Sequence, residues 1–226
     1  RVAASNGCGA GPWSAVFDFS TLAGPGDCGP GTSPVVAFSD SFEGGAPGWT
    51  HSAASGSDTW ALLASPAPVH AGTYAYVAAD SSSVSDQRLV SPAVALPSGQ
   101  APLTLEFWNR QEIEDNGTAA CYDGAIAEIS TNGGSTWVQL LDAVLLTDPY
   151  NGPVSNGYSN PLAGLRAWCG DPQEYLESVV NLDAYAGATV RFRFRVGTDS
   201  STGRTYGWAI DAVTVQSCAP AGAALA

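Results

Sequence analysis

The clearest pattern in this chain is a short-range alternation of apolar and polar residues. In 102–109, leucine and phenylalanine alternate with polar side chains, and in 189–197 phenylalanine and valine alternate with Arg191, Arg193 and Arg195. A period of two is typical of a strand that buries one face. Similar strand signals recur along the chain, at 35–40, 58–63, 72–78, 86–91, 102–109, 124–131, 135–141, 176–181, 189–197 and 207–216.

Glycine and proline separate these segments. The chain holds 26 Gly and 15 Pro, and no stretch shows a long helical period. Short, evenly spaced strands without amphipathic helices predict an all-β protein, an antiparallel β-sandwich of jelly-roll type.

The last predicted strand contains an anomaly. Asp211 lies among alanine, isoleucine and valine in 207–216. A carboxylate in so apolar a strand costs several kcal/mol unless it is paired or binds a metal.

Composition narrows the possible partners. Net charge is -13, all 8 basic residues are arginine, and charged residues make up only 13% of the 226. Such a field repels nucleic acid and anionic membranes and attracts divalent cations. No apolar run reaches the roughly 18 residues of a membrane span, so we expect no membrane insertion.

The five cysteines indicate an oxidising compartment. None forms a CxxC pair, so a zinc site is not predicted, and four of the five are expected to form two disulfides in a secreted protein. The sequence opens without a signal-peptide pattern, so we expect it to be a piece of a longer chain.

The chain divides unevenly. Residues 1–22 resemble the C-terminal hairpin of a fibronectin type III domain, 23–34 form a linker rich in glycine and proline, 35–218 form the jelly roll, and 219–226 form a tail. Two strands cannot bury a core alone. The hairpin therefore either belongs to a domain outside this chain or docks on the next one.

One long segment, 145–175, interrupts the strands. Segments of this length in compact domains are usually functional or disordered. A Cys121–Cys169 disulfide would pin it to the sheet. It carries aromatic side chains that either form a sugar- or peptide-binding platform or cover a sheet face: Tyr150, Tyr158, Trp168 and Tyr175.

Several short motifs occur in an order similar to that of MAM-type jelly rolls. Bacterial relatives are the "choice-of-anchor J" and immune-inhibitor accessory domains of secreted multidomain proteins. The matching motifs are Phe42-Glu43 with Gly48-Trp49, Asp58-Thr59-Trp60, Ser91-Pro92, Tyr122-Asp123-Gly124, Asn160-Pro161-Leu162, Leu182 to Gly187, Val190 to Phe194, and Trp208 to Val215.

The resemblance implies a calcium ion near the adjacent first and last strands. The ligands it implies are Glu43, Asp58 and Asp211, with Asp40 as a weaker candidate; alternatively, Asp211 pairs with an arginine or accepts backbone N–H bonds. Family members often carry a cysteine after the final strand, which implies a Cys28–Cys218 disulfide. The rival pairing, Cys8–Cys28, stays open.

A second acidic group precedes the 124–131 strand: Glu112, Glu114, Asp115 and Asp123. These acids fit a second cation site, the acid/base pair of a glycosidase, or a solvated loop. Arginines 191, 193 and 195 either bind an anionic glycan or peptide or pair with acids across the sheet. The segment 130–137 fits an Asp-box hairpin with Asn132 in place of Asp, a structural motif whose Trp137 we expect to pack inward.

No catalytic motif is present. The sequence lacks HExxH, GxSxG and a P-loop, and its two histidines have no local triad. We therefore predict a non-catalytic, calcium-stabilised accessory module whose partner is the catalytic domain of a secreted bacterial protein, plausibly a protease. The alternatives are a carbohydrate-binding module that uses the 145–175 aromatics and, less favoured, a glycan-active enzyme that uses the 112–123 acids.

Overall fold

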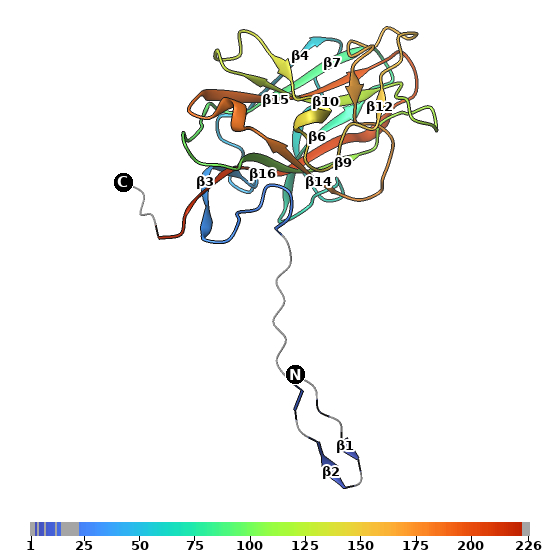
Figure 1. Cartoon of the computed structure of the whole chain (residues 1–226). Coiled ribbons are helices and arrows are strands. Elements are labelled where there is room, and N and C mark those ends of the chain that lie inside the picture. The colour runs from blue at the N-terminus through green and yellow to red at the C-terminus, as the bar shows by residue number, and fades with distance from the viewer. Residues whose placement is uncertain (1–2, 4, 7, 12, 15–22, 223–226) are drawn as a thin grey trace.

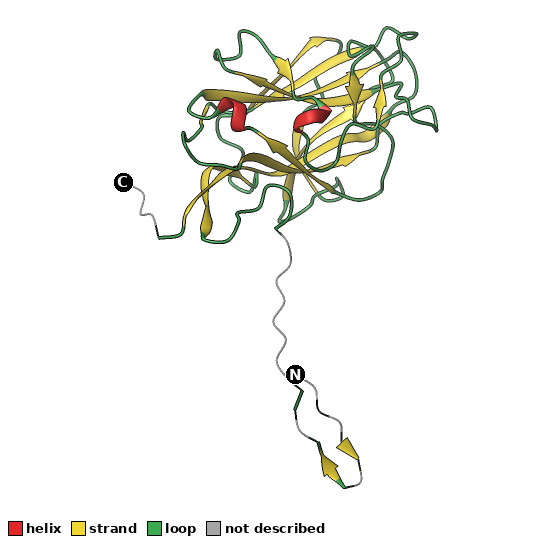
Figure 2. Cartoon of the chain, in the orientation of Figure 1, coloured by secondary structure: helices red, strands yellow, loops and turns green. Residues whose placement is uncertain are grey.

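Two antiparallel sheets of six strands each pack into a β-sandwich, as the computed structural model shows (Figures 1 and 2). The structure describes residues 3, 5–6, 8–11, 13–14 and 23–222. The predicted all-β sandwich is confirmed. Among the described residues, no helix is long and apolar enough to cross a membrane.

The first sheet has the order β14, β9, β16, β6, β5, and β3 also pairs with β16. Its strands are β3 (Thr32–Asp40), β5 (Ala61–Ala64), β6 (Tyr74–Asp80), β9 (Leu103–Gln111), β14 (Leu176–Asn181) and β16 (Arg204–Pro220). Because β16 is long, it pairs along one edge with β6 through 208–210 and then with β3 through 213–220. The first and last strands of the sandwich are therefore neighbours.

The second sheet has the order β11, β10, β15, β7, β4, and β8 also pairs with β15. Its strands are β4 (Thr50–Ser55), β7 (Ser85–Val90), β8 (Val94–Ala95), β10 (Gly124–Ser130), β11 (Val138–Gln139) and β15 (Thr189–Thr198). Smaller elements are the pairs β1 (Ser5–Asn6) with β2 (Gly9–Ala10) and β12 (Gly152–Pro153) with β13 (Arg166–Ala167), and the 3-10 turns Asp142–Val144 and Asp183–Tyr185.

The core lies between the sheets and is rich in aromatic rings. Phe194 of β15 packs edge-on against Phe107 of β9 with ring centroids 5.0 Å apart, and Trp208 of β16 lies against both Phe194 and Trp168. These rings are fully buried. The period-two pattern of β9 and β15 thus produces the buried face that the sequence predicts.

Both disulfides that the sequence favours are present. Cys28 pairs with Cys218, and Cys121 pairs with Cys169. The rival Cys8–Cys28 pairing is wrong, because Cys28 is bonded to the end of β16, next to the β3 pairing.

Several strand predictions differ from the structure, and the short strands β8, β12 and β13 were not predicted. Strand β4 was not expected, because it is an exposed edge strand of serine, threonine, histidine and alanine without an apolar alternation. The predicted strand 135–141 shrinks to β11, because the preceding residues form the turn between β10 and β11.

The N-terminal region is only partly described. Strands β1 and β2 form the predicted hairpin; 15–22 and the tail residues 223–226 lie outside the described residues. In the predicted linker, Gly26 has a φ of +86° and approaches Val179 and Thr104 so closely that a Cβ would lie 2.8 Å from Val179 Cγ1. The 23–34 segment therefore packs on the first sheet near β14. The division into domains stays a prediction.

Candidate functional site

The outer face of the second sheet gathers opposite charges. Alternation in β15 turns its phenylalanines inward and its arginines outward, and the register places Glu128 opposite Arg193 and Arg88 opposite Arg195. We call this set the arginine face; its members are Asp86, Arg88, Glu128, Arg191, Arg193 and Arg195.

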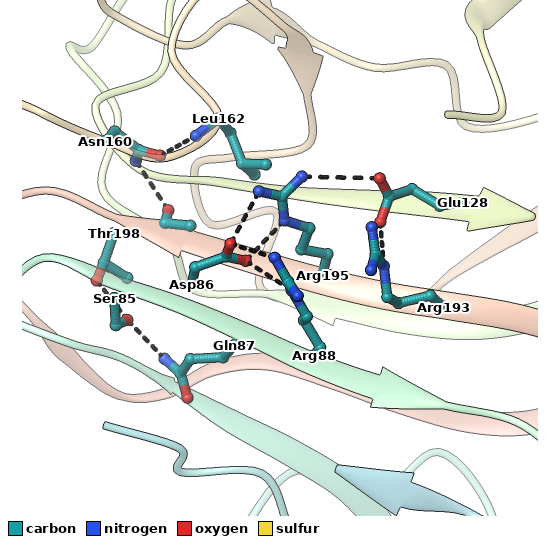
Figure 3. Close-up of polar contacts among 11 residues, drawn as sticks. Ser85, Asp86, Gln87, Arg88, Glu128, Asn160, Leu162, Arg193, Arg195 and Thr198 are labelled. Carbon is teal, nitrogen blue, oxygen red and sulfur yellow. Dashed lines mark hydrogen bonds and ion pairs between the residues drawn. The ribbon is translucent and has the colours of Figure 1, made fainter. Parts of the chain in front are cut away.

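Two carboxylates hold most of these arginines in place (Figure 3). Arg195 donates to both oxygens of Asp86 at 2.7 and 2.9 Å, and Arg88 donates to the same carboxylate at 2.7 Å. Arg193 donates to Glu128. Burial acts to raise the pKa of Asp86, but hydrogen bonds from Arg195 and Arg88 outweigh it, so the pKa lies below its usual value. The cross-strand pairing interpretation is therefore confirmed for Arg193 and Arg195.

The face nevertheless keeps an excess of positive charge. Four of the 8 basic residues face only two acids here, in a chain of charge -13. Arg191 donates to the Ser91 carbonyl oxygen at 2.8 Å, and within the described part of the chain it has no ion pair with a carboxylate. This guanidinium keeps donors for a ligand.

Beside this arginine lies a recess of about 450 Å³. Its lining combines three arginines, one aromatic ring and small polar groups: Thr50, Ser52, Arg88, Val90, Gly133, Gly134, Trp137, Arg191 and Arg193. The guanidinium carbon of Arg193 lies 4.5 Å from the centroid of the Trp137 ring, a cation–π distance. Trp137 is half-buried, so part of its surface is open to solvent.

The Asp-box hairpin orients this tryptophan. Asn132 accepts from the Thr136 N–H at 2.9 Å and donates to the Thr136 hydroxyl at 2.8 Å. Gly134, at a φ of +95°, leaves room for the ring, since a Cβ there would lie 3.3 Å from it. The structural role of the box is confirmed, but Trp137 packs on the outer face of the sheet rather than inward.

The aromatics of 145–175 do not form an exposed platform. Tyr150 and Trp168 are 2% and 0% exposed, and their rings pack against each other in the core with centroids 4.5 Å apart and a tilt of 59°. Tyr175 is half-buried and donates to the Pro68 carbonyl oxygen. Tyr158 is 49% exposed and packs against Tyr122. The platform hypothesis is wrong for Tyr150 and Trp168, because both rings fill the sandwich.

The first predicted cation set has protein partners of its own. Asp211 Oδ2 accepts from the N–H groups of His70 and Ala71 at 2.9 and 3.1 Å, and Oδ1 accepts from Ala212 at 2.7 Å. Glu43 Oε1 accepts from Thr73 and Tyr74, both at 2.8 Å. Together they fasten the 70–74 segment by backbone N–H bonds.

The other two members of that set, Asp40 and Asp58, have partners outside the 70–74 segment. Asp58 pairs with His51 at 2.7 Å, and Asp40 accepts from the Trp49 indole N–H at 2.9 Å. In the described ranges, the three acids whose oxygens lie within 4.8 Å of one another are a different group, Glu114, Asp123 and Asp199. A cation bound by Glu43, Asp58 and Asp211 stays a prediction.

The group of Glu114, Asp123 and Asp199 shares two residues with the acidic set predicted before the 124–131 strand. Glu114 and Asp123 are brought together, whereas Asp115 is exposed and accepts from Gly117, and Glu112 is not a member. Burial and the neighbouring carboxyl of Asp80 raise the pKa of Asp123 well above its usual value. Glu114, Asp123 and Asp199 lie close enough together to hold a metal ion, one of the three uses that the sequence leaves open for Glu114 and Asp123.

Sequence reasoning missed Trp137, Arg88, Asp80 and Asp199. Asp80, Trp137 and Asp199 lie at a strand end or in a hairpin, Arg88 lies within β7, and the neighbours of all four come from distant segments. A charged residue at the end of an apolar strand was the available signal for Asp80 and Asp199, which end β6 and follow β15.

Comparison with known proteins shows the fold. No family model matches this chain, and no curated protein matches it. The K3 cleaved adhesin domain of Lys-gingipain from Porphyromonas gingivalis W83 is similar in structure, with a TM-score of 0.50, 18% identity, and coverage of 81% of this chain and 99% of that domain.

Two further solved structures are more distant. The K1 adhesin domain of the same protein has a TM-score of 0.47 at 18% identity over 82% of this chain and 98% of that one. TmCBM61 in complex with β-1,4-galactotriose has a TM-score of 0.44 at 17% identity over 77% of this chain and 92% of that one. The similarity to the K3 domain supports the β-sandwich fold described above.

Proposed function

We propose that this chain is a non-catalytic glycan-binding module of an extracellular protein, and that its ligand occupies the recess beside Trp137. The observation that carries the proposal is the combination, in one open recess, of an aromatic ring with guanidinium groups. The adhesin neighbour is compatible with a binding role, but the proposal rests on the recess.

The lining favours a sugar that bears a carboxylate. An exposed aromatic face contacts the apolar face of a sugar ring, and convergent polar groups fix its orientation. Guanidinium groups bind carboxylates through paired hydrogen bonds. Arg191, whose donors are not taken by an acid of the described chain, is the residue suited to that contact.

The same geometry argues against catalysis. A glycosidase needs two carboxyl groups that reach the substrate. Asp86 and Glu128 are held in ion pairs by the arginine face, and Asp123 is fully buried. Among the 112–123 acids, Asp123 is therefore not accessible to a substrate as an acid or base.

Trp137→Ala should reduce affinity for an acidic oligosaccharide at least tenfold, because truncating a stacked aromatic anchor typically costs 2 kcal/mol or more. Glycan-array screening identifies a ligand for the wild-type protein, and isothermal titration measures the loss.

Arg191→Gln should weaken the binding of the same ligand and reduce the salt dependence of that binding.

Tyr158→Ala is the matched control, since this ring is exposed but lies in the 145–175 segment. It should leave affinity unchanged. If Tyr158→Ala abolishes binding and Trp137→Ala does not, the ligand lies on the long segment instead. Equal binding of neutral and acidic sugars would contradict the role of Arg191.

The wider context completes the proposal. Two disulfides fit an oxidising, extracellular compartment. The proposal has three further parts. The module belongs to the MAM-like and choice-of-anchor J group, a fibronectin type III domain precedes it, and it is attached to a catalytic domain such as a protease. Calcium is the cofactor that the family resemblance implies.

A further inference from the structure

Four carboxyl groups meet at one end of the sandwich. Asp80 is the last residue of β6 and Glu114 follows β9 in the first sheet; Asp123 precedes β10 and Asp199 follows β15 in the second. We call these four the end cluster. Its members come from four strand ends, two in each sheet, so the cluster bridges the two layers.

The groups are close together and buried. One oxygen from each of Glu114, Asp123 and Asp199 lies within 4.8 Å of the others, and the carboxyl of Asp80 neighbours that of Asp123. Asp80, Asp123 and Asp199 are 2%, 0% and 1% exposed. Like charges at this spacing, out of water, are strongly unfavourable unless something neutralises them.

In Asp80 and Asp123, one oxygen is anchored and the other is left without a donor. Asp123 Oδ1 accepts from the Asp199 N–H and from Asn160 Nδ2, and Asp80 Oδ2 accepts from the Glu114 N–H. In contrast, Asp80 Oδ1, Glu114 Oε2 and Asp123 Oδ2 are buried and accept no hydrogen bond from any residue that the structure describes. Buried acceptors are nearly always satisfied, so this arrangement requires either protons shared between the carboxyl groups or a bound cation.

We propose that the end cluster binds a divalent cation of the calcium type, which ties the two sheets together. All the donors are oxygens, and neither cysteine nor histidine is among them, which disfavours zinc. Magnesium usually keeps several of its waters, which a buried cluster does not easily accommodate. The charge of Arg204, which acts on Asp80, offsets part of the remaining negative charge.

This site is separate from the ligands implied by the family resemblance. The Glu43 and Asp211 oxygens that hold 70–74 already accept two backbone N–H bonds each, whereas the end cluster has free acceptors. It is also independent of the glycan recess, since it shares no residue with that lining.

The test is thermal unfolding of the protein after removal of metal with EDTA and dialysis, with Ca²⁺, Mg²⁺ or no metal added back. Calcium at about a hundred times its Kd should raise Tm by about 5–10 °C, and magnesium should raise it less. Isothermal titration of Ca²⁺ should give a binding event that Asp123→Asn removes.

Asp123→Asn carries a second expectation. Its amide oxygen can keep the bonds from Asp199 and Asn160, while its NH₂ donates to the facing Asp80 carboxylate. Without metal, this variant should therefore melt at a higher temperature than the metal-free wild type, yet show no calcium response. Glu114→Gln, a second variant, should likewise lose the response.

Two controls decide between sites. Glu174→Gln removes one exposed charge and should keep the full calcium response. Glu43→Gln reports on the ligand set that the family resemblance implies. A response that survives Asp123→Asn but is lost in Glu43→Gln would overturn the proposal in favour of the other set. A wild-type protein with no calcium response would overturn it as well, leaving the acids to share protons.

Discussion

Asp86→Ala is expected to destabilise the protein by about 3–5 kcal/mol, because it leaves two guanidinium groups without their shared partner. The Asp86 side chain is 7% exposed, and Arg195 and Arg88 are 15% and 29% exposed. Among the described residues, Arg195 reaches one other carboxylate oxygen, Glu128 Oε1 at 3.7 Å, so it cannot recover a close ion pair without rearrangement.

Urea unfolding followed by tryptophan fluorescence measures this loss. The matched control is Asp142→Ala, which breaks the exposed pair with Arg166, whose side chains are 35% and 50% exposed. Exposed pairs contribute about 0–1 kcal/mol. If Asp86→Ala and Asp142→Ala lower the free energy of unfolding equally, the buried ion pairs of the arginine face contribute no more than an exposed pair.

The same carboxylate should contribute to acid unfolding. The pKa of Asp86 is lower in the folded protein than its usual value, so its contribution is present above the unfolded pKa of about 3.9. That contribution is lost as pH falls through the lower folded pKa. Asp86→Ala should therefore flatten the decline in stability below about pH 4.

Strands could be predicted where an alternation of apolar and polar side chains marks a buried face. Strand β14 was expected at 176–181 and is found there, and β15 differs from 189–197 by one residue at its end. Strand β4 could not be found in this way, because an exposed edge strand is held by its hydrogen bonds to β7 rather than by an apolar face.

The candidate sites depend on contacts that a linear pattern does not contain. Trp137 was expected to pack inward because Asp-box tryptophans do so in the motif, but its surroundings depend on Arg193 of a neighbouring strand. Asp211 was correctly singled out as a buried charge, and backbone N–H groups from 70–71 satisfy it. The backbone donors that reach Asp211 lie in a loop about 140 residues away along the chain.

Replacing both Cys28 and Cys218 by serine is expected to lower stability by about 5 kcal/mol, the largest single effect anticipated for this chain. The disulfide spans a sequence separation of 190, and closing a loop of that length removes about 5 kcal/mol of unfolded-chain entropy in the chain-entropy model. The bond also fastens the seam where β3 pairs with the end of β16.

The Cys121–Cys169 pair supplies the internal comparison, because its separation of 48 predicts a smaller effect, about 4 kcal/mol. Urea unfolding of the two double-serine variants, each under non-reducing conditions, measures both. A Cys28/Cys218 variant as stable as the wild type would show that the strand pairing alone closes the seam. A larger loss at the shorter loop would mean that native contacts of the 145–175 segment, rather than loop length, set the contribution of each bond.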